Sequence, residues 1–209
     1  MLIEQVPTVF RKLFPKTVWR LQKPEKTVYL TFDDGPIPEE TPFVLDLLRQ
    51  HNIKATFFCV GENVKKHPEI FQMVLNEGHK VGNHTYNHLA GLTNFSKKYI
   101  ENVGKADEYI HSKLFRPPHG TFRYEQFVFL RRNYTIVFWD VVTRDYNCKL
   151  SGDDVLNIVK KYTRNGSIIV FHDSLKASKN MRYALPRAIE YLKSEGYKFD
   201  VLSDETING

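Results

Sequence analysis

Short apolar runs alternate along the chain with longer stretches in which apolar residues recur every three or four positions. The apolar runs are rich in β-branched and aromatic residues, which is typical of buried strands. They predict strands at 27–32, 55–60, 80–82, 114–116, 135–142, 167–171 and 198–202. The stretches between them predict helices, of which 96–113 is a long one.

Glycines mark the ends of three predicted helices. Gly78, Gly166 and Gly196 each lie between a helical pattern and a strand pattern, where a left-handed C-terminal cap needs a residue without a side chain. Ser151, with Asp154 three positions later, predicts the start of another helix. These boundaries support the division into alternating strands and helices.

Regular alternation of strand and helix predicts parallel strands joined by crossover helices. With about seven such units, an incomplete (β/α) barrel fits better than a doubly wound sheet. One domain over residues 27–209 accounts for the whole pattern, because the sequence shows no second composition regime and no linker. Residues 1–26 are not periodic and predict a short helix and a connector packed on that domain.

Composition limits the classes of function. The chain has 209 residues and a net charge of +6, but its basic residues are scattered pairs rather than one patch, so no nucleic-acid partner is expected. Neither a bilayer-spanning run nor a secretory h-region is present, which predicts a cytoplasmic protein unless a signal was removed. Cys59 and Cys148 predict no disulfide framework, and the oligomeric state stays open.

Two adjacent carboxylates follow the first predicted strand. Asp33 and Asp34 come just before Gly35 and Pro36, which permit and enforce a sharp turn. Such a turn can bring both carboxylates into one pocket, where one could bind a metal and the other act as a base. The alternative is that both aspartates only form the turn and cap the next helix.

Further polar residues follow other predicted strands. His84 and His88 are four positions apart, so one turn of chain can bring both imidazoles to one metal, whereas the alternative is two surface histidines. Together with one aspartate they would form a site with two imidazoles and one carboxylate that leaves positions open. The segment 116–120, Asp145 and the pair at 172–173 also follow strands. In a parallel barrel these C-terminal strand ends form the active-site face.

Five segments resemble, in order and spacing, the motifs of the polysaccharide deacetylases, the NodB-homology domains of carbohydrate esterase family four. They are TFDDGP at 31–36, HTYNH at 84–88, RPPHG at 116–120, WDVVTRDY at 139–146 and VFHD at 170–173. The resemblance extends from about residue 27 to about residue 202. It implies a distorted (β/α) barrel and metal-dependent removal of N- or O-acetyl groups from sugar polymers.

The resemblance also implies a role for each matching residue. The implied metal ligands are Asp34, His84 and His88. The implied catalytic residues are Asp33 as the base, Arg116 as its orienting partner, His172 as the acid and Asp145 as the carboxylate that tunes it. The backbone N–H of His119 is implied as an oxyanion donor. One divalent metal is expected, with zinc first and cobalt, nickel or manganese as alternatives.

His172 closes an apolar strand, so burial should disfavour its charged form unless a carboxylate offsets it. Asp145 ends the preceding strand and is the first candidate. Asp173 is the second, because adjacent side chains on a strand diverge.

Three positions depart from the family pattern. Val142 replaces an aspartate, Tyr146 a tryptophan and Val170 a leucine. We expect Tyr146 and Val170 to shape the acetyl pocket and the wall of the cleft. The expected partner is an acetylated glycan. A small-amide or ureide amidohydrolase and a non-catalytic glycan-binding module are the alternatives.

Overall fold

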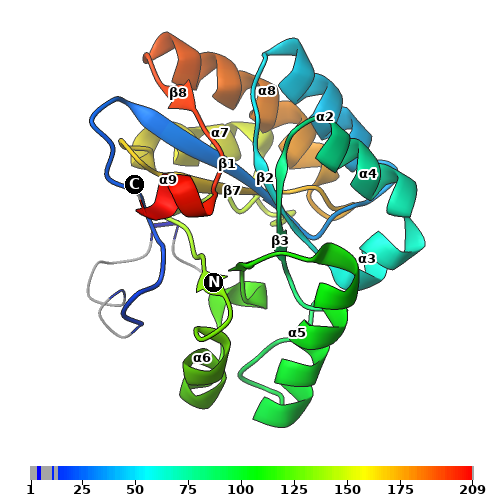
Figure 1. Cartoon of the computed structure of the whole chain (residues 1–209). Helices are drawn as coiled ribbons and strands as arrows, with labels where there is room; N and C mark the ends of the chain where they lie inside the picture. Colours follow the sequence, from blue (N-terminus) through cyan, green and yellow to red (C-terminus); the bar gives the residue numbers. More distant parts are fainter. Residues whose placement is uncertain (1–3, 6–10, 12–13, 209) are drawn as a thin grey trace.

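The computed structural model describes residues 4–5, 11 and 14–208. Within them a curled sheet of parallel strands carries helices on its outer side, which confirms the predicted distorted, incomplete (β/α) barrel (Figure 1). The strands are β1 (Thr27–Asp33), β2 (Thr56–Cys59), β3 (Lys80–Asn83), β4 (Leu114–Phe115), β5 (Thr135–Ile136), β6 (Val141–Val142), β7 (Ile168–His172) and β8 (Lys198–Phe199). Their order is β5-β4-β3-β2-β1-β7-β6, and β8 pairs with β1.

The helices follow the predicted alternation. They are α2 (Thr41–Gln50), α3 (Gly61–Lys66), α4 (Pro68–Asn76), α5 (Ser96–Ile110), α6 (Tyr124–Leu130), α7 (Gly152–Tyr162), α8 (Ser178–Ser194) and α9 (Asp204–Asn208), with a 3-10 turn at Pro118–Gly120. Gly78 and Gly196 directly follow the C-caps of α4 and α8 with φ of 78° and 79°, which confirms two of the three predicted left-handed caps. The third prediction is wrong, because α7 ends in the extended Thr163 and Gly166, with φ of 77°, lies in the turn beyond it. Ser151 forms the predicted capping box with Asp154. None of the helices in the described part of the chain has the length and apolar character needed to cross a bilayer.

The prediction of one strand over 135–142 is wrong. That run is divided into β5, which pairs with β4, and β6, which pairs with β7 at the opposite end of the strand order. The four residues between them pass from one edge of the sheet to the other. At the first edge the Val137 N–H donates to the carbonyl oxygen of Phe115, and at the second the Asp140 N–H donates to that of Ile168. Residues 135–142 therefore cannot form one continuous strand, because the two ends of this segment pair with different edges of the sheet.

Alternation along the central strands separates two cores. On β1, Val28, Leu30 and Phe32 face the outer core, where α2, α7 and α8 pack. Tyr29 lies in the inner core, enclosed by the curled sheet. Because side chains alternate, Thr31 and Asp33 share the inner face with Tyr29. On β7, Val170 lies in the inner core, so His172 shares that face, and Asp33 and His172 are register partners on adjacent strands.

The described part of the N-terminal segment contacts the barrel. Trp19 stacks on Phe138 with ring centroids 4.0 Å apart, and Val18 bridges to Val137. Residues 14–26 contain no helix, and most of the residues before them lie outside the described part of the chain, so the short helix predicted within 1–26 stays a prediction. The division into a connector at 1–26 and a catalytic domain at 27–209 stays a prediction.

Candidate active site

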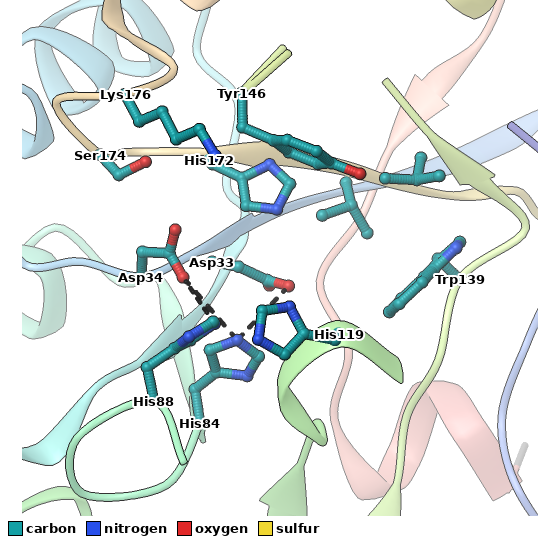
Figure 2. Close-up of a pocket in the computed structure, with 12 residues that line it drawn as sticks. Asp33, Asp34, His84, His88, His119, Trp139, Tyr146, His172, Ser174 and Lys176 are labelled. Atoms are coloured by element: carbon teal, nitrogen blue, oxygen red, sulfur yellow. Dashed lines mark ion pairs between the residues drawn. The ribbon is translucent and has the colours of Figure 1, made fainter. Parts of the chain in front are cut away.

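A pocket of about 450 Å³ opens at the C-terminal ends of the strands (Figure 2). It is lined by Asp33, Asp34, His84, His88, His119, Trp139, Val142, Tyr146, Val170, His172, Ser174 and Lys176. Eight of the ten predicted site residues are among these. The other two, Arg116 and Asp145, lie buried behind the pocket wall and contact lining residues.

The two adjacent aspartates reach the pocket through the turn that follows β1. Asp33 is the last residue of β1, and Asp34 has a φ of 87°, which turns the chain so that both carboxylates line one pocket. Asp173 stabilises this turn by accepting hydrogen bonds from the Gly35 N–H at 3.0 Å and the Thr41 hydroxyl at 2.6 Å. A Cβ on Gly35 would lie 2.0 Å from Asp173 Oδ2, so only glycine fits here.

Asp34, His84 and His88 form a candidate metal site. Their ligand atoms all lie within 4.8 Å of one another. Asp34 Oδ1 lies 3.3 Å from His88 Nε2 and 3.9 Å from His84 Nε2, as the dashed lines in Figure 2 mark. That oxygen is buried and has no hydrogen-bond partner, and coordination to a metal ion would satisfy it. The three residues therefore fit a divalent ion.

The protonation of His84 suits a ligand. Its Nδ1 lies 2.8 Å from the Arg116 carbonyl oxygen, and because a carbonyl only accepts, Nδ1 carries the proton and Nε2 keeps its lone pair. Burial lowers the pKa of His84 to about 4, so the ring is neutral near pH 7. Burial would raise the pKa of Asp34, but the neighbouring imidazoles and a hydrogen bond from Ser174 outweigh it and lower this pKa.

Arg116 is completely buried beside Asp33. Its Nη1 donates to Asp33 Oδ1 at 2.6 Å and to the Thr31 hydroxyl at 2.8 Å, and its Nη2 donates to the Phe138 carbonyl at 3.0 Å. The guanidinium carbon lies 3.9 Å from the ring centroid of Phe58. These contacts hold the guanidinium in one place, so one oxygen of Asp33 is bound and the other faces the pocket.

His172 contacts Asp145, the first of its two candidate partners. Asp145 Oδ1 lies 2.7 Å from His172 Nδ1, and Oδ2 accepts the His172 backbone N–H at 2.8 Å. Burial alone lowers the pKa of His172, but Asp145, with smaller contributions from Asp34 and Asp33, more than offsets it and the pKa is raised to about 9. Asp173 instead bonds to the turn after β1, and burial raises its own pKa to about 8.

Apolar side chains form another part of the wall. Trp139, Val142 and Val170 line it, and Trp139 packs so closely over Gly120 that a Cβ there would lie 2.5 Å from the indole. Tyr146 lies edge-on to His172, with ring centroids 4.9 Å apart. His119 has a φ of 59°, and its ring centroid lies 4.8 Å from that of His88. The use of its backbone N–H as an oxyanion donor stays a prediction.

Four lining residues were not assigned to the site from the sequence: Trp139, Val142, Ser174 and Lys176. Trp139 is the first residue of the motif at 139–146, and its place in that motif could have identified it as a site residue. Ser174 and Lys176 follow β7 without any spacing that marks them, so only their contacts identify them.

Residues 20–133 match the family model of polysaccharide deacetylase. The chain belongs to the polysaccharide deacetylase family. It is 34% identical over 193 residues to a peptidoglycan-N-acetylglucosamine deacetylase of Bacillus cereus, covering 89% of this chain and 91% of that protein. Membership makes the chain a hydrolase of the deacetylase class and does not favour the small-amide alternative.

Two solved structures with this fold are, by name, a deacetylase and a pseudoenzyme. The crystal structure of the Bc1960 peptidoglycan N-acetylglucosamine deacetylase, in complex with 4-naphthalen-1-yl-N-oxidanyl-benzamide, has a TM-score of 0.88, 33% identity and 97% coverage of both chains. Wild-type BA3943, a pseudoenzyme of this esterase family from Bacillus anthracis, has a TM-score of 0.81 and 28% identity, covering 92% of this chain and 69% of that one. Because the same fold occurs in a pseudoenzyme, catalysis depends on the residues of the pocket as well as on the fold.

Proposed function

We propose that this protein hydrolyses the N-acetyl groups of amino sugars in a peptidoglycan-type glycan, using one divalent metal. The observation that carries the proposal is the pairing of Asp33 with His172. They are register partners on β1 and β7, both on the inner face, and each is held by a buried partner of opposite charge. A carboxylate bound to a guanidinium and an imidazolium bound to a carboxylate, side by side at one pocket, suit a base and an acid.

Asp33 is the base in this proposal. Hydrolysis of an acetamide needs a proton removed from water and a proton delivered to the departing amine. Arg116 binds Oδ1 of Asp33, so Oδ2 is the oxygen available to take the proton of the attacking water. A metal held by Asp34, His84 and His88 would supply Lewis-acid polarisation of the acetyl carbonyl and of that water.

His172 is the acid. Asp145 binds its Nδ1, which leaves the proton on Nε2 for the amine nitrogen as the C–N bond breaks. The raised pKa keeps the imidazole protonated near pH 7. The backbone N–H of His119 is the proposed hydrogen-bond donor to the developing oxyanion. The acetyl methyl lies against Trp139, Val142 and Val170 in this arrangement. The products are acetate and a free amine.

The proposed metal is zinc, and the proposed substrate is peptidoglycan. Two imidazoles and one carboxylate with open positions are a donor set that zinc accepts, and cobalt, nickel and manganese are tested beside it. The Bacillus cereus relative and the solved Bc1960 protein are both named peptidoglycan N-acetylglucosamine deacetylases, which supports the choice of glycan.

An acetate-release assay tests this function. Protein stripped with a chelator is restored with each metal and incubated with N-acetylated chitooligosaccharides, peptidoglycan strands and O-acetylated xylan. We expect acetate only from restored protein and mainly from the N-acetylated glycans, with release by Asp33→Asn slower by about a hundredfold or more. Absence of acetate from every glycan with every metal would overturn the proposal, and release from a small amide alone would favour an amidohydrolase.

A further inference from the structure

Lys176 places a positive charge at the mouth of the pocket. It lies in the turn between β7 and α8, is exposed, and lines the pocket on the side of Ser174, across from Trp139 (Figure 2). Its ammonium nitrogen lies 5.8 Å from the ring centroid of Tyr146. No carboxylate of the described residues forms an ion pair with it, whereas Lys66, Lys97 and Lys198 each have one. The ammonium is therefore available to a ligand.

The two sides of the pocket differ in chemistry. Trp139 and the two valines offer an apolar surface that suits the methyl of an acetyl group. His172, the proposed acid, must face the nitrogen that departs with the sugar. Lys176 lies on the side of His172, so it lies beside the sugar and not beside the acetyl group.

We propose that Lys176 binds a carboxylate carried by the glycan strand and thereby determines specificity for anionic strands. In chemical terms the carboxylate is the 3-O-lactyl group of a muramic acid unit, either on the sugar that loses its acetyl group or on its neighbour. A lysine ammonium on a flexible stem suits such a group, because it can follow a carboxylate whose position varies. This inference rests on the proposed function and adds the feature of the substrate that the site recognises.

The test compares Lys176→Met with Lys179→Met, a matched variant that removes the same charge from an exposed lysine outside the pocket lining. Three substrates are used: neutral N-acetylglucosamine oligomers, peptide-free peptidoglycan strands, and the same strands with the lactyl carboxylates converted to methyl amides. We expect Lys176→Met to lower kcat/KM for the carboxylate strands relative to the neutral oligomers by about tenfold, mainly through KM. Lys179→Met should leave this ratio unchanged.

Wild-type protein supplies a second measurement that does not depend on any variant folding. Amidation of the strands should lower their kcat/KM by a similar factor, and added salt should reduce the preference for the free carboxylate. Lys176→Arg should restore most of it. Mass spectrometry of the products identifies which sugar lost its acetyl group. It thereby shows whether the carboxylate is on that sugar or on its neighbour.

Binding separates this inference from the proposed function. In Asp33→Asn, titration calorimetry measures strand affinity without turnover, so a carboxylate preference that requires Lys176 supports the inference even where no glycan is hydrolysed. Equal effects of Lys176→Met on carboxylate and neutral glycans, or an unchanged preference after amidation, would overturn the inference while acetate release still upheld the function.

Discussion

Replacing Asp145 by asparagine tests whether this carboxylate raises the pKa of His172, the proposed acid. Asp145 is buried and accepts three hydrogen bonds, from Nδ1 and the backbone N–H of His172 and from the Tyr146 N–H. Burial alone would lower the pKa of His172 below its ordinary 6.5, but Asp145, the largest of the raising causes, acts with Asp34 and Asp33 to bring it to about 9. Asparagine removes the charge and leaves the burial, so the pKa should fall by about two units or more.

The expected consequence is a shift of the alkaline limb of kcat/KM to lower pH, because only protonated His172 can donate to the leaving amine. With a pKa near 9, about 90% of the imidazole is protonated at pH 8. With a pKa of about 6.5, about 3% is protonated, so kcat/KM at pH 8 should drop about 30-fold. At pH 6 the difference should be under about twofold. A bound metal cation would lower the pKa of His172 in the wild-type protein and in Asp145→Asn alike, so the limb would still move to lower pH in the variant.

The assay is acetate release from pH 5 to 10, with metal content and thermal melting measured on the same samples. One amide cannot accept all three hydrogen bonds, so the free energy of unfolding should fall by about 1–3 kcal/mol while the metal is kept. Asp173→Asn is the matched control, because Asp173 is also buried but contacts the Gly35 N–H and Thr41. An unmoved limb in Asp145→Asn together with a shifted limb in Asp173→Asn would refute the assignment.

Three further predictions concern the turn after β1 and the metal site. Asp34→Ala and His88→Ala should each lose the divalent metal in elemental analysis, and full retention in both would place the metal elsewhere. Asp33→Asn should keep the metal and lose about a hundredfold or more in kcat, so an active variant would remove Asp33 from the role of base. Gly35→Ala should lower the free energy of unfolding by about 1–3 kcal/mol, because its Cβ would lie 2.0 Å from Asp173 Oδ2; unchanged melting would contradict this.

Local patterns in the sequence determined the helices and strands and located the site at the C-terminal ends of the strands. The apolar runs predicted strand positions, and glycine after a helical stretch predicted left-handed caps, which the structure confirms at Gly78 and Gly196. Gly166 is left-handed but lies in a turn beyond α7, whose C-cap Thr163 is extended. The motif residues could be assigned to one face because the C-terminal ends of parallel strands share an edge. These features depend on neighbouring residues only, so periodicity and turn chemistry are enough to find them.

The tertiary structure decided which strands are neighbours. It placed Asp33 of β1 beside His172 of β7, 139 positions away, and divided the run at 135–142 between two edges of the sheet. It brought Lys176 into the pocket although nothing in its sequence context marks it. Such adjacencies arise from the packing of helices and side chains on both faces of the sheet. That packing involves the whole chain at once and leaves no trace in the local spacing of residues.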